Sequence, residues 1–277
     1  MKEFLNVGCG TRFLEDWTNI DFISTHPSVI SADLLNGIQS EDNCFEVVYT
    51  SHLLEHFDRQ GGLNFLRECY RVLKPGGILR VIVPDLEQIT KLYIEKLQTV
   101  LGDPSSLNEA NYFWSYLELY DQTTRRSPGG EIMKYWSNMD IINFEYIERR
   151  VGFEFLNFRN QAIKKNKTNV VSSKQSFLIS FLNRITSFAK RKINLILNGS
   201  DFQKYFELGK FISSGELHLM MYDRYSLTCL LDKVGFKKIT VVDAHTSRIS
   251  NWQNYKWLDV EEGKTRKPDS LFIEAYK

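Results

Sequence analysis

The chain has 277 residues, of which 43% are hydrophobic and 25% charged, the composition of a globular protein with one large domain or one domain that carries a long insertion. Its formal net charge of +1 gives no reason to expect a nucleic-acid partner. No apolar run approaches the roughly 20 residues that cross a bilayer, and the first ten residues, MKEFLNVGCG, lack the pattern of a secretory signal. The four cysteines lie far apart, so we expect reduced thiols and a cytoplasmic protein.

Short apolar runs in residues 3–85 predict strands, because each run ends at a turn signal and the intervals between them are short or amphipathic. The runs cover residues 4–7, 18–22, 28–33, 45–50 and 78–83. Apolar residues at helical spacing over 63–73 predict a helix that ends at Lys74-Pro75-Gly76-Gly77. This alternation is typical of an α/β fold with a parallel sheet.

Residues 86–215 lose the strand pattern. Helical periodicity over 86–101, 108–120 and 139–158, with a loop at 127–130, predicts a helical insertion that has its own apolar core. Residues 216–277 return to α/β character, with a helix over 225–234 that ends at Gly235 and strands over 236–243 and 270–276. We therefore expect one sheet domain, formed by residues 1–85 and 216–277 and interrupted by residues 86–215 as a helical insertion.

Positive charge is concentrated in one part of the insertion. Between Arg159 and Ser200 there are nine basic and no acidic residues, whereas the rest of the chain is net acidic. Apolar residues at helical spacing predict an amphipathic basic helix over 177–197. This helix is either a solvated face or a peripheral contact with the inner face of a membrane.

Small and acidic residues follow the first three predicted strands. Gly8 and Gly10 allow the backbone to approach a ligand closely. A dinucleotide fingerprint needs a third glycine where Phe13 stands, and only seven residues separate Gly10 from the second strand, so dinucleotide binding is not expected. Asp21 can accept both hydroxyls of a ribose and Asp33 can accept from an exocyclic amine, although aspartate also ends strands for turn reasons.

The ordered set of motifs resembles the class I S-adenosylmethionine-dependent methyltransferases, specifically the type-11 methyltransferase superfamily. The likeness is strong over residues 3–85, fair over 218–277 and absent from most of 86–217. It implies a Rossmann-like sheet of seven strands with the last one antiparallel, and an enzyme that converts S-adenosylmethionine to S-adenosylhomocysteine. The motifs that carry it are Leu5-Asn6-Val7-Gly8-Cys9-Gly10, Asn19-Ile20-Asp21, Ala32-Asp33-Leu34, Ser51-His52-Leu53-Leu54-Glu55-His56 and Glu68-Cys69-Tyr70-Arg71-Val72-Leu73-Lys74-Pro75-Gly76-Gly77.

The resemblance also implies which residues bind the cofactor. The glycine loop holds the methionine part, the acid after the second strand holds the ribose, the pair after the third strand lies beside adenine, and the residues after the fourth flank the sulfonium. In that order the matching residues are Asn6, Gly8 and Gly10, then Asp21, then Asp33 and Leu34, then Ser51 and His52. Arg12 replaces the usual third glycine and the first helix is truncated, which predicts weaker cofactor binding.

A further likeness concerns the acceptor. The stretches His218-Leu219-Met220-Met221-Tyr222-Asp223 and Arg266-Lys267-Pro268-Asp269-Ser270-Leu271 resemble those of methyltransferases associated with surface-polysaccharide and glycan gene clusters. This likeness implies O-methylation of a sugar or glycan in polysaccharide biosynthesis, with the insertion over residues 86–215 as a lid that binds the acceptor. The alternatives are another small-molecule acceptor, or a cofactor-binding pseudoenzyme that serves as a scaffold. Five aromatic residues of the insertion either stack on sugar rings or form its core: Tyr112, Trp114, Tyr116, Tyr135 and Trp136.

Methyl transfer to a hydroxyl depends on positioning, and a base helps because a hydroxyl is a weak nucleophile. We expect His218 as this base with Asp223 nearby, and His52 as the second candidate, although His218 can also pack or cap a helix locally. His52-Leu53-Leu54-Glu55-His56 also matches the H-x-x-E-H zinc-peptidase pattern. Zinc there needs one continuous helix and a distant third ligand, so we expect no metal and structural roles for Glu55 and His56.

Overall fold

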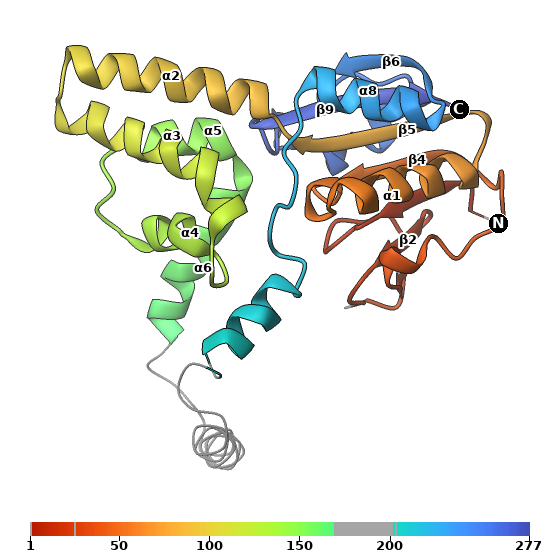
Figure 1. Ribbon diagram of the computed structural model, residues 1–277, viewed down its shortest axis with the longest axis horizontal. Coiled ribbons are helices and arrows are strands. Elements are labelled where there is room, and N and C mark those ends of the chain that lie inside the picture. The colour runs from red at the N-terminus through yellow and green to blue at the C-terminus, as the bar shows by residue number, and fades with distance from the viewer. Residues whose placement is uncertain (1, 25, 169–201, 203) are drawn as a thin grey trace.

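Seven strands form one sheet in the order β3-β2-β1-β4-β5-β9-β6 in the computed structural model, which describes residues 2–24, 26–168, 202 and 204–277 (Figure 1). Strands β1 to β5 pair in parallel, and β9 is antiparallel to both β5 and β6. The expected Rossmann-like sheet with an antiparallel last strand is confirmed. The bounds are β1 Phe4–Val7, β2 Thr18–Asp21, β3 Val29–Ser31, β4 Phe45–Ser51, β5 Leu73–Pro84, β6 Lys237–Val242 and β9 Ser270–Tyr276.

Two helices, α1 (Arg59–Val72) and α8 (Arg224–Val234), cover one face of the sheet and lie side by side in Figure 1. Their inward residues, such as Leu66 and Leu231, pack with Val48, Leu79 and Ile273 of the strands in one buried cluster. The other face is covered by residues 244–260, which include the short turns η3 (Trp252–Asn254) and η4 (Lys256–Leu258). Both faces are therefore buried, as a parallel sheet requires.

Helix α1 shows how the sequence sets an element's bounds. It begins after Asp58, whose side chain accepts a hydrogen bond from the Gly61 N–H at 2.7 Å, and this capping carries the helix four residues upstream of the expected start. At its other end α1 runs directly into β5. The Lys-Pro-Gly-Gly segment that was expected to separate them belongs to β5, with Gly76 in the left-handed region at φ 79°.

The insertion between β5 and α8 is helical, as expected. It contains α2 Leu86–Gly102, α3 Ser106–Thr124, α4 Gly130–Ser137, α5 Phe144–Val151, α6 Phe153–Thr168 and a further helix over residues 204–212. Trp114, Trp136, Ile147 and Phe155 form its own buried cluster, and in Figure 1 helices α2 to α6 make a lobe beside the sheet. The residue limits of 86–215 as an acceptor-binding lid stay a prediction.

Some local expectations were wrong. The helical stretch over 139–158 is divided into α5 and α6 at Gly152, which has φ 67°. Helix α4 was not predicted, nor was the small hairpin of β7 (Val260–Glu261) and β8 (Lys264–Thr265). Elements this short carry too few periodic residues to be recognised from sequence.

The basic helix expected over residues 177–197 lies outside the described residues. Within the described part of the basic segment, Arg159 is buried and donates hydrogen bonds to the backbone carbonyls of Trp136 and Asn138, so it belongs to the packing of the insertion. None of the described helices combines the length and the apolar character needed to cross a membrane. All four cysteines are free thiols.

Candidate functional site

Three adjoining cavities lie where β1, β2, β3 and β4 end. We name them the aspartate cavity (about 230 Å³, with Asp21 and Asp33), the glycine-loop cavity (about 280 Å³, with Gly8 and Gly10) and the histidine cavity (about 250 Å³, with His52 and His218). Gly8 lines the first two and His52 lines the last two. The strand order reverses between β1 and β4, and ligands of open α/β sheets bind outside the carboxyl ends of strands at such a point.

The aspartate cavity brings together three residues that were expected to bind a nucleoside: Asp21, Asp33 and Leu34. The Asp21 Oδ2 atom accepts a hydrogen bond from the Gly10 N–H at 2.7 Å. Asp33 caps the turn η1 (Leu34–Asn36) by accepting from the Leu35 N–H at 3.0 Å. The walls between the two acids are largely apolar and include Phe22, Leu34, Leu35, Leu53 and Phe57.

The glycine-loop cavity is lined by Asn6, Gly8, Gly10, Ser51 and His52. Gly8 has φ 71°, and a Cβ atom added there would lie 2.7 Å from Leu53 Cδ2. Gly10 has φ 54° and open space where a side chain would be. The first glycine is therefore required by packing and conformation, and the second leaves backbone exposed to a ligand. Asn6 is buried and its Nδ2 atom donates to the Arg12 carbonyl at 3.0 Å, which holds the loop closed.

Arg12 fastens this loop from the other side, since no helix follows it before β2. Its guanidinium donates to the Trp257 carbonyl, pairs with Glu261 Oε2 at 3.1 Å and lies 4.4 Å from the centre of the Trp257 ring. The residue that replaces the third glycine thus anchors the loop to the C-terminal part of the chain. The predicted weakening of cofactor binding stays a prediction.

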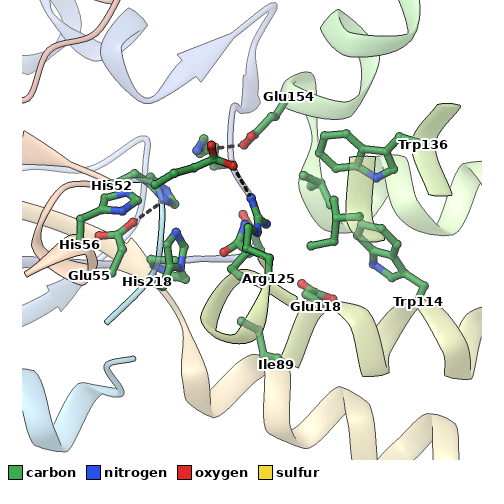
Figure 2. A pocket seen from close by; sticks show the side chains of 17 residues that line it. His52, Glu55, His56, Ile89, Trp114, Glu118, Arg125, Trp136, Glu154 and His218 are labelled. Carbon is green, nitrogen blue, oxygen red and sulfur yellow. Dashed lines mark hydrogen bonds and ion pairs between the residues drawn. The ribbon is translucent and has the colours of Figure 1, made fainter. Parts of the chain in front are cut away.

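The histidine cavity lies between the sheet and the insertion, as Figure 2 shows. His52, Glu55, His56 and His218 are gathered on one side, and Trp114 and Trp136 stand on the other. Charged side chains lie between them. The cavity is lined in addition by Glu118, Gln122, Arg125, Glu154, Glu216, Lys267 and Asp269.

His52 has both ring nitrogens paired. Its Nδ1 atom lies 3.2 Å from Glu55 Oε1, and its Nε2 atom lies 2.9 Å from the Ser270 hydroxyl. Since a carboxylate only accepts, Nδ1 carries the proton and Nε2 accepts from Ser270. Burial and the charge of Lys267 lower the pKa of His52, against the opposing effect of Glu55, so the ring is neutral near pH 7.

Glu55 is fully buried, a feature that the sequence did not indicate. It sits in the single turn η2 (Leu54–His56) that follows β4, not on a continuous helix. Burial alone would raise the pKa of this carboxyl, but the hydrogen bond with His52 and the neighbouring His218 and His56 lower it to about 2. Glu55 is therefore a buried carboxylate surrounded by histidines.

His218 is 8% exposed and reaches the cavity from the segment by which the insertion returns to the sheet. Its backbone N–H donates to the Gln122 carbonyl, and the two N–H groups that follow it donate to the Glu55 carbonyl at 2.8 and 3.1 Å. Burial lowers its pKa to about 3. The structure thus brings both candidate bases, His218 and His52, to one cavity.

Asp223 does not join them, because it is not among the residues that line the histidine cavity. Its Oδ1 atom accepts from the N–H groups of Tyr225 and Ser226, and the Ser226 hydroxyl completes a capping box at the start of α8. The expected partnership with His218 therefore gives way to helix capping.

Three cavity residues had no site role predicted from the sequence: Glu154, which lies in no recognised motif, and Lys267 and Asp269, whose stretch carried only a likeness. Glu154 and Lys267 form an ion pair of 2.9 Å, and the Lys267 charge lowers the pKa of Glu154 to about 2 although burial opposes it. Burial, reinforced by Glu118, raises the pKa of Asp269 to about 7. These residues come from α6 and from the segment before β9, and only the fold brings them together.

Residues 5–81, which run from β1 into β5, match the family model described as a methyltransferase domain. No curated protein matches the chain. Among solved structures, similar ones are an S-adenosylmethionine-dependent methyltransferase from Archaeoglobus fulgidus (13% identity, 99% of this chain and 85% of that chain, TM-score 0.39) and a possible histamine N-methyltransferase from Thermotoga maritima (12%, 99% and 82%, 0.37). The likeness of this chain to methyltransferases therefore lies in residues 5–81.

Proposed function

We propose that this S-adenosylmethionine-dependent methyltransferase transfers its methyl group to a hydroxyl of a sugar or glycan. S-adenosylmethionine supplies an electrophilic methyl group on a sulfonium, and S-adenosylhomocysteine is the product. The observation that carries the acceptor proposal is the histidine cavity, which meets the glycine-loop cavity at His52 and combines indole rings with carboxylates.

The residues of the aspartate cavity and of the glycine-loop cavity fit the cofactor. In the aspartate cavity an adenine fits between Leu34, Leu53 and Phe57, and the Asp21 carboxylate retains acceptor capacity for ribose hydroxyls beyond the Gly10 N–H. Asp33 supports the adenine end from the cap of η1. The open backbone at Gly10, together with Asn6 and Ser51, lines the space for the methionine part.

The chain's own contribution to the reaction is positioning and proton removal. The acceptor oxygen attacks the methyl carbon in line with the carbon–sulfur bond, which breaks toward sulfur, while the hydroxyl proton passes to a base. His52 lines both the glycine-loop and the histidine cavities, and its Nε2 lone pair is occupied only by the Ser270 hydroxyl. We assign the base role to His52, with His218 as the second candidate.

The lining of the histidine cavity supports a sugar. Trp114 and Trp136, which are 1% and 5% exposed, line the apolar wall, and Glu118, Glu154 and Glu216 offer acceptors for several hydroxyls. Both tryptophans also belong to the core of the insertion, so the acceptor surface is a continuation of that core. The surface-polysaccharide setting, a cytoplasmic location and a membrane contact through residues 177–197 complete the proposal.

The acceptor class is tested by methyl transfer from labelled S-adenosylmethionine to a panel of free sugars, nucleotide sugars, lipid-linked glycans and small phenols or amines. Turnover of a sugar-containing acceptor and a mass increase of one methyl group on oxygen are expected. Turnover restricted to amines or phenols would overturn the sugar assignment. A chain that binds the cofactor and turns over no acceptor would point to a scaffold role.

Cofactor binding has its own prediction. Asp21→Ala removes the ribose acceptor and frees the Gly10 N–H, so we expect affinity for S-adenosylhomocysteine to fall at least about 10-fold, as the loss of a charge-assisted hydrogen bond does. Titration calorimetry measures it. Asp16→Ala is the matched control, since Asp16 is exposed in the loop between β1 and β2 and lines none of the three cavities. Equal affinities of the two variants would reject the aspartate cavity as the nucleoside site.

A further inference from the structure

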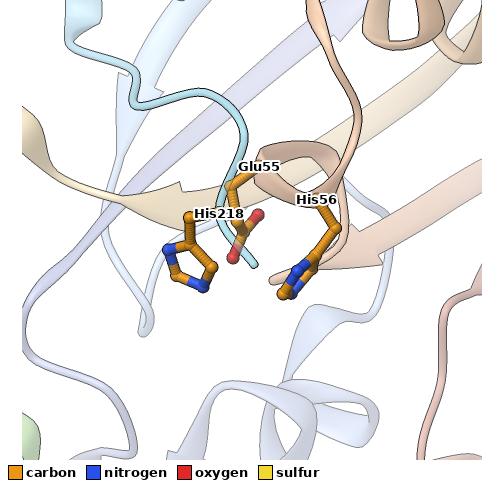
Figure 3. A group of neighbouring side chains, drawn as sticks. All are labelled: Glu55, His56 and His218. Carbon is orange, nitrogen blue, oxygen red and sulfur yellow. The ribbon is translucent and has the colours of Figure 1, made fainter. Parts of the chain in front are cut away.

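Three potential metal ligands converge at one end of the histidine cavity: Glu55, His56 and His218 (Figure 3). Each can offer one ligand atom, and these atoms all lie within 4.8 Å of one another. Figure 3 shows the Glu55 carboxylate between the two imidazole rings. The first two residues are neighbours in sequence, and the third comes from the far end of the insertion.

The cluster contains polar atoms that the protein itself leaves unpaired. Glu55 is 0% exposed, and its Oε2 atom has no hydrogen-bond partner among the described residues. His218 is 8% exposed, and its Nδ1 atom is unpaired as well. Buried polar atoms are costly when unpaired, and here two of them lie in one cluster that lines a cavity.

The ligand atoms are also prepared for coordination. The His56 Nδ1 atom lies 3.1 Å from the Leu217 carbonyl, to which it can only donate, so Nε2 bears the lone pair. A histidine N–H bound to a backbone carbonyl is the usual support of a metal-binding imidazole. His52 supports Glu55 in the same manner, because its Nδ1 atom lies 3.2 Å from Oε1 and leaves Oε2 open.

The backbone holds the third ligand against the first. The N–H groups of Leu219 and Met220 both donate to the Glu55 carbonyl, at 2.8 and 3.1 Å. The ring of His218 meets that of His56 edge-on, with centroids 4.8 Å apart. Ligand atoms around a tetrahedral zinc ion lie roughly 3.4 Å apart when its bonds are about 2.1 Å, so side-chain movements of about 1 Å complete the site.

We propose that Glu55, His56 and His218 bind a divalent transition-metal ion, with Zn²⁺ the best match to the donor set. Two imidazoles and one carboxylate are the donors of zinc sites that keep a fourth position open. The H-x-x-E-H pattern of zinc peptidases would need His52 as a ligand on one continuous helix, which η2 is not. In the structure His52 supports Glu55 from behind, and the third ligand is His218.

The site deepens the proposed function and rests on it for its role. All three ligands line the cavity that we assign to the acceptor, so an open coordination position of the ion would face that cavity. A hydroxyl oxygen bound there would lose its proton more readily, because a bound cation lowers the pKa of a coordinated hydroxyl. His218 would then act as a ligand, and His52 would remain to accept the proton.

The test uses the full chain, stripped with a chelator and titrated with Zn²⁺ alone by calorimetry. We expect one equivalent to bind, and His218→Ala to weaken binding at least about 100-fold. His245→Ala is the matched control, because His245 is an exposed histidine outside the cavity. Co²⁺ loading should give the visible absorption of a four-coordinate site in the unmodified chain and in His245→Ala. That absorption should be lost in His218→Ala.

Two results would overturn the proposal: no stoichiometric binding by the unmodified chain, or equal affinity in His218→Ala. Glu55→Gln serves as a second variant if His218→Ala does not keep its circular dichroism spectrum. Metal binding is read without substrate, so its failure is separate from failure of the proposed function. Methyl transfer to a sugar by metal-free protein would reject the role of the metal in the reaction and leave the acceptor proposal intact. Stoichiometric zinc binding without turnover of any sugar would reject only the proposal that the acceptor is a sugar.

Discussion

His52 combines an unfavourable backbone conformation with a central position. Its φ of 52° lies in the left-handed region, which non-glycine residues adopt at a cost and which recurs at functional sites. The conformation is held by the N–H of His52, which donates to the Ile82 carbonyl, and by the two hydrogen-bonded ring nitrogens. The ring lies between Glu55 and Ser270 at the junction of two cavities, where a base can accept the hydroxyl proton.

His52→Asn separates this chemical role from the backbone role. Asparagine tolerates the left-handed region better than most residues, so the variant should keep the native fold. Its affinity for S-adenosylhomocysteine should change by less than a few fold. The imidazole base is lost, and kcat should fall roughly 10²–10⁴-fold. Steady-state methyl transfer and calorimetry on the same preparation measure both quantities. An unchanged kcat would assign the base elsewhere.

At the scale of elements, the break between α5 and α6 ties the insertion to the sheet domain. Gly152 has φ 67°, and a Cβ atom added there would lie 2.5 Å from the Arg266 carbonyl oxygen. The Phe153 N–H donates to that same carbonyl at 3.1 Å. Without this break, the helices could not approach the segment that carries Lys267 and Asp269 into the histidine cavity.

Gly152→Ala should therefore destabilise the protein by about 2 kcal/mol or more, from the left-handed conformation and from the clash with backbone. Gly209→Ala is the matched control, because Gly209 is exposed in the helix over 204–212 and an added Cβ meets nothing within 4 Å. That change should stabilise by about 0.5–1 kcal/mol. Urea unfolding midpoints measure both. Equal midpoints would show that the break imposes no conformational constraint.

The fold could be predicted where single elements carry their own signal. The runs at Phe4–Val7 and Ser270–Tyr276 are apolar, bounded by turns and fully paired in the sheet, so their pattern sufficed. Gly152 read as an ordinary residue within a helical stretch, because the need for a left-handed conformation arises from Arg266, more than a hundred positions away. Helix α4 could not be predicted from the sequence, because its eight residues are too few to show a clear helical period.

At the scale of the whole molecule, the site also contains residues whose grouping could be predicted from the sequence and residues whose grouping could not. The residues expected to bind cofactor follow successive parallel strands, and parallel strands bring their ends to one edge, so their grouping followed from topology. Their roles stay predictions. Glu154 and Lys267 come from the insertion and from the approach to β9, and no local pattern links them. The buried state of Glu55 also depends on this assembly, since the returning segment at His218 covers it.

The protonation of Asp269 depends on the contact between the sheet domain and the helical insertion. It precedes β9, its carbonyl accepts from the Asp85 N–H at 2.9 Å, and its Oδ1 atom is buried without a partner among the described residues. Glu118, Arg150 and Glu154 of the insertion and Lys267 beside it act on its charge. Burial, then Glu118, raises its pKa to about 7, so the folded protein holds a proton that the unfolded chain releases near pH 4.

Asp269→Asn should remove this linkage. Because the pKa of Asp269 is raised in the folded state, its contribution to stability is complete below the unfolded pKa and is lost as pH rises through the folded pKa. The native protein therefore loses stability between about pH 4 and 7. The slope is at most about 1.4 kcal/mol per pH unit for one group. The melting temperature of Asp269→Asn should therefore rise relative to the native chain between pH 5 and 8. Asp223→Asn is the control: hydrogen bonds at the α8 cap lower the pKa of Asp223, so its difference should stay constant over that range. A constant difference for Asp269→Asn as well would mean that solvent reaches this carboxyl and that the two lobes do not close over it.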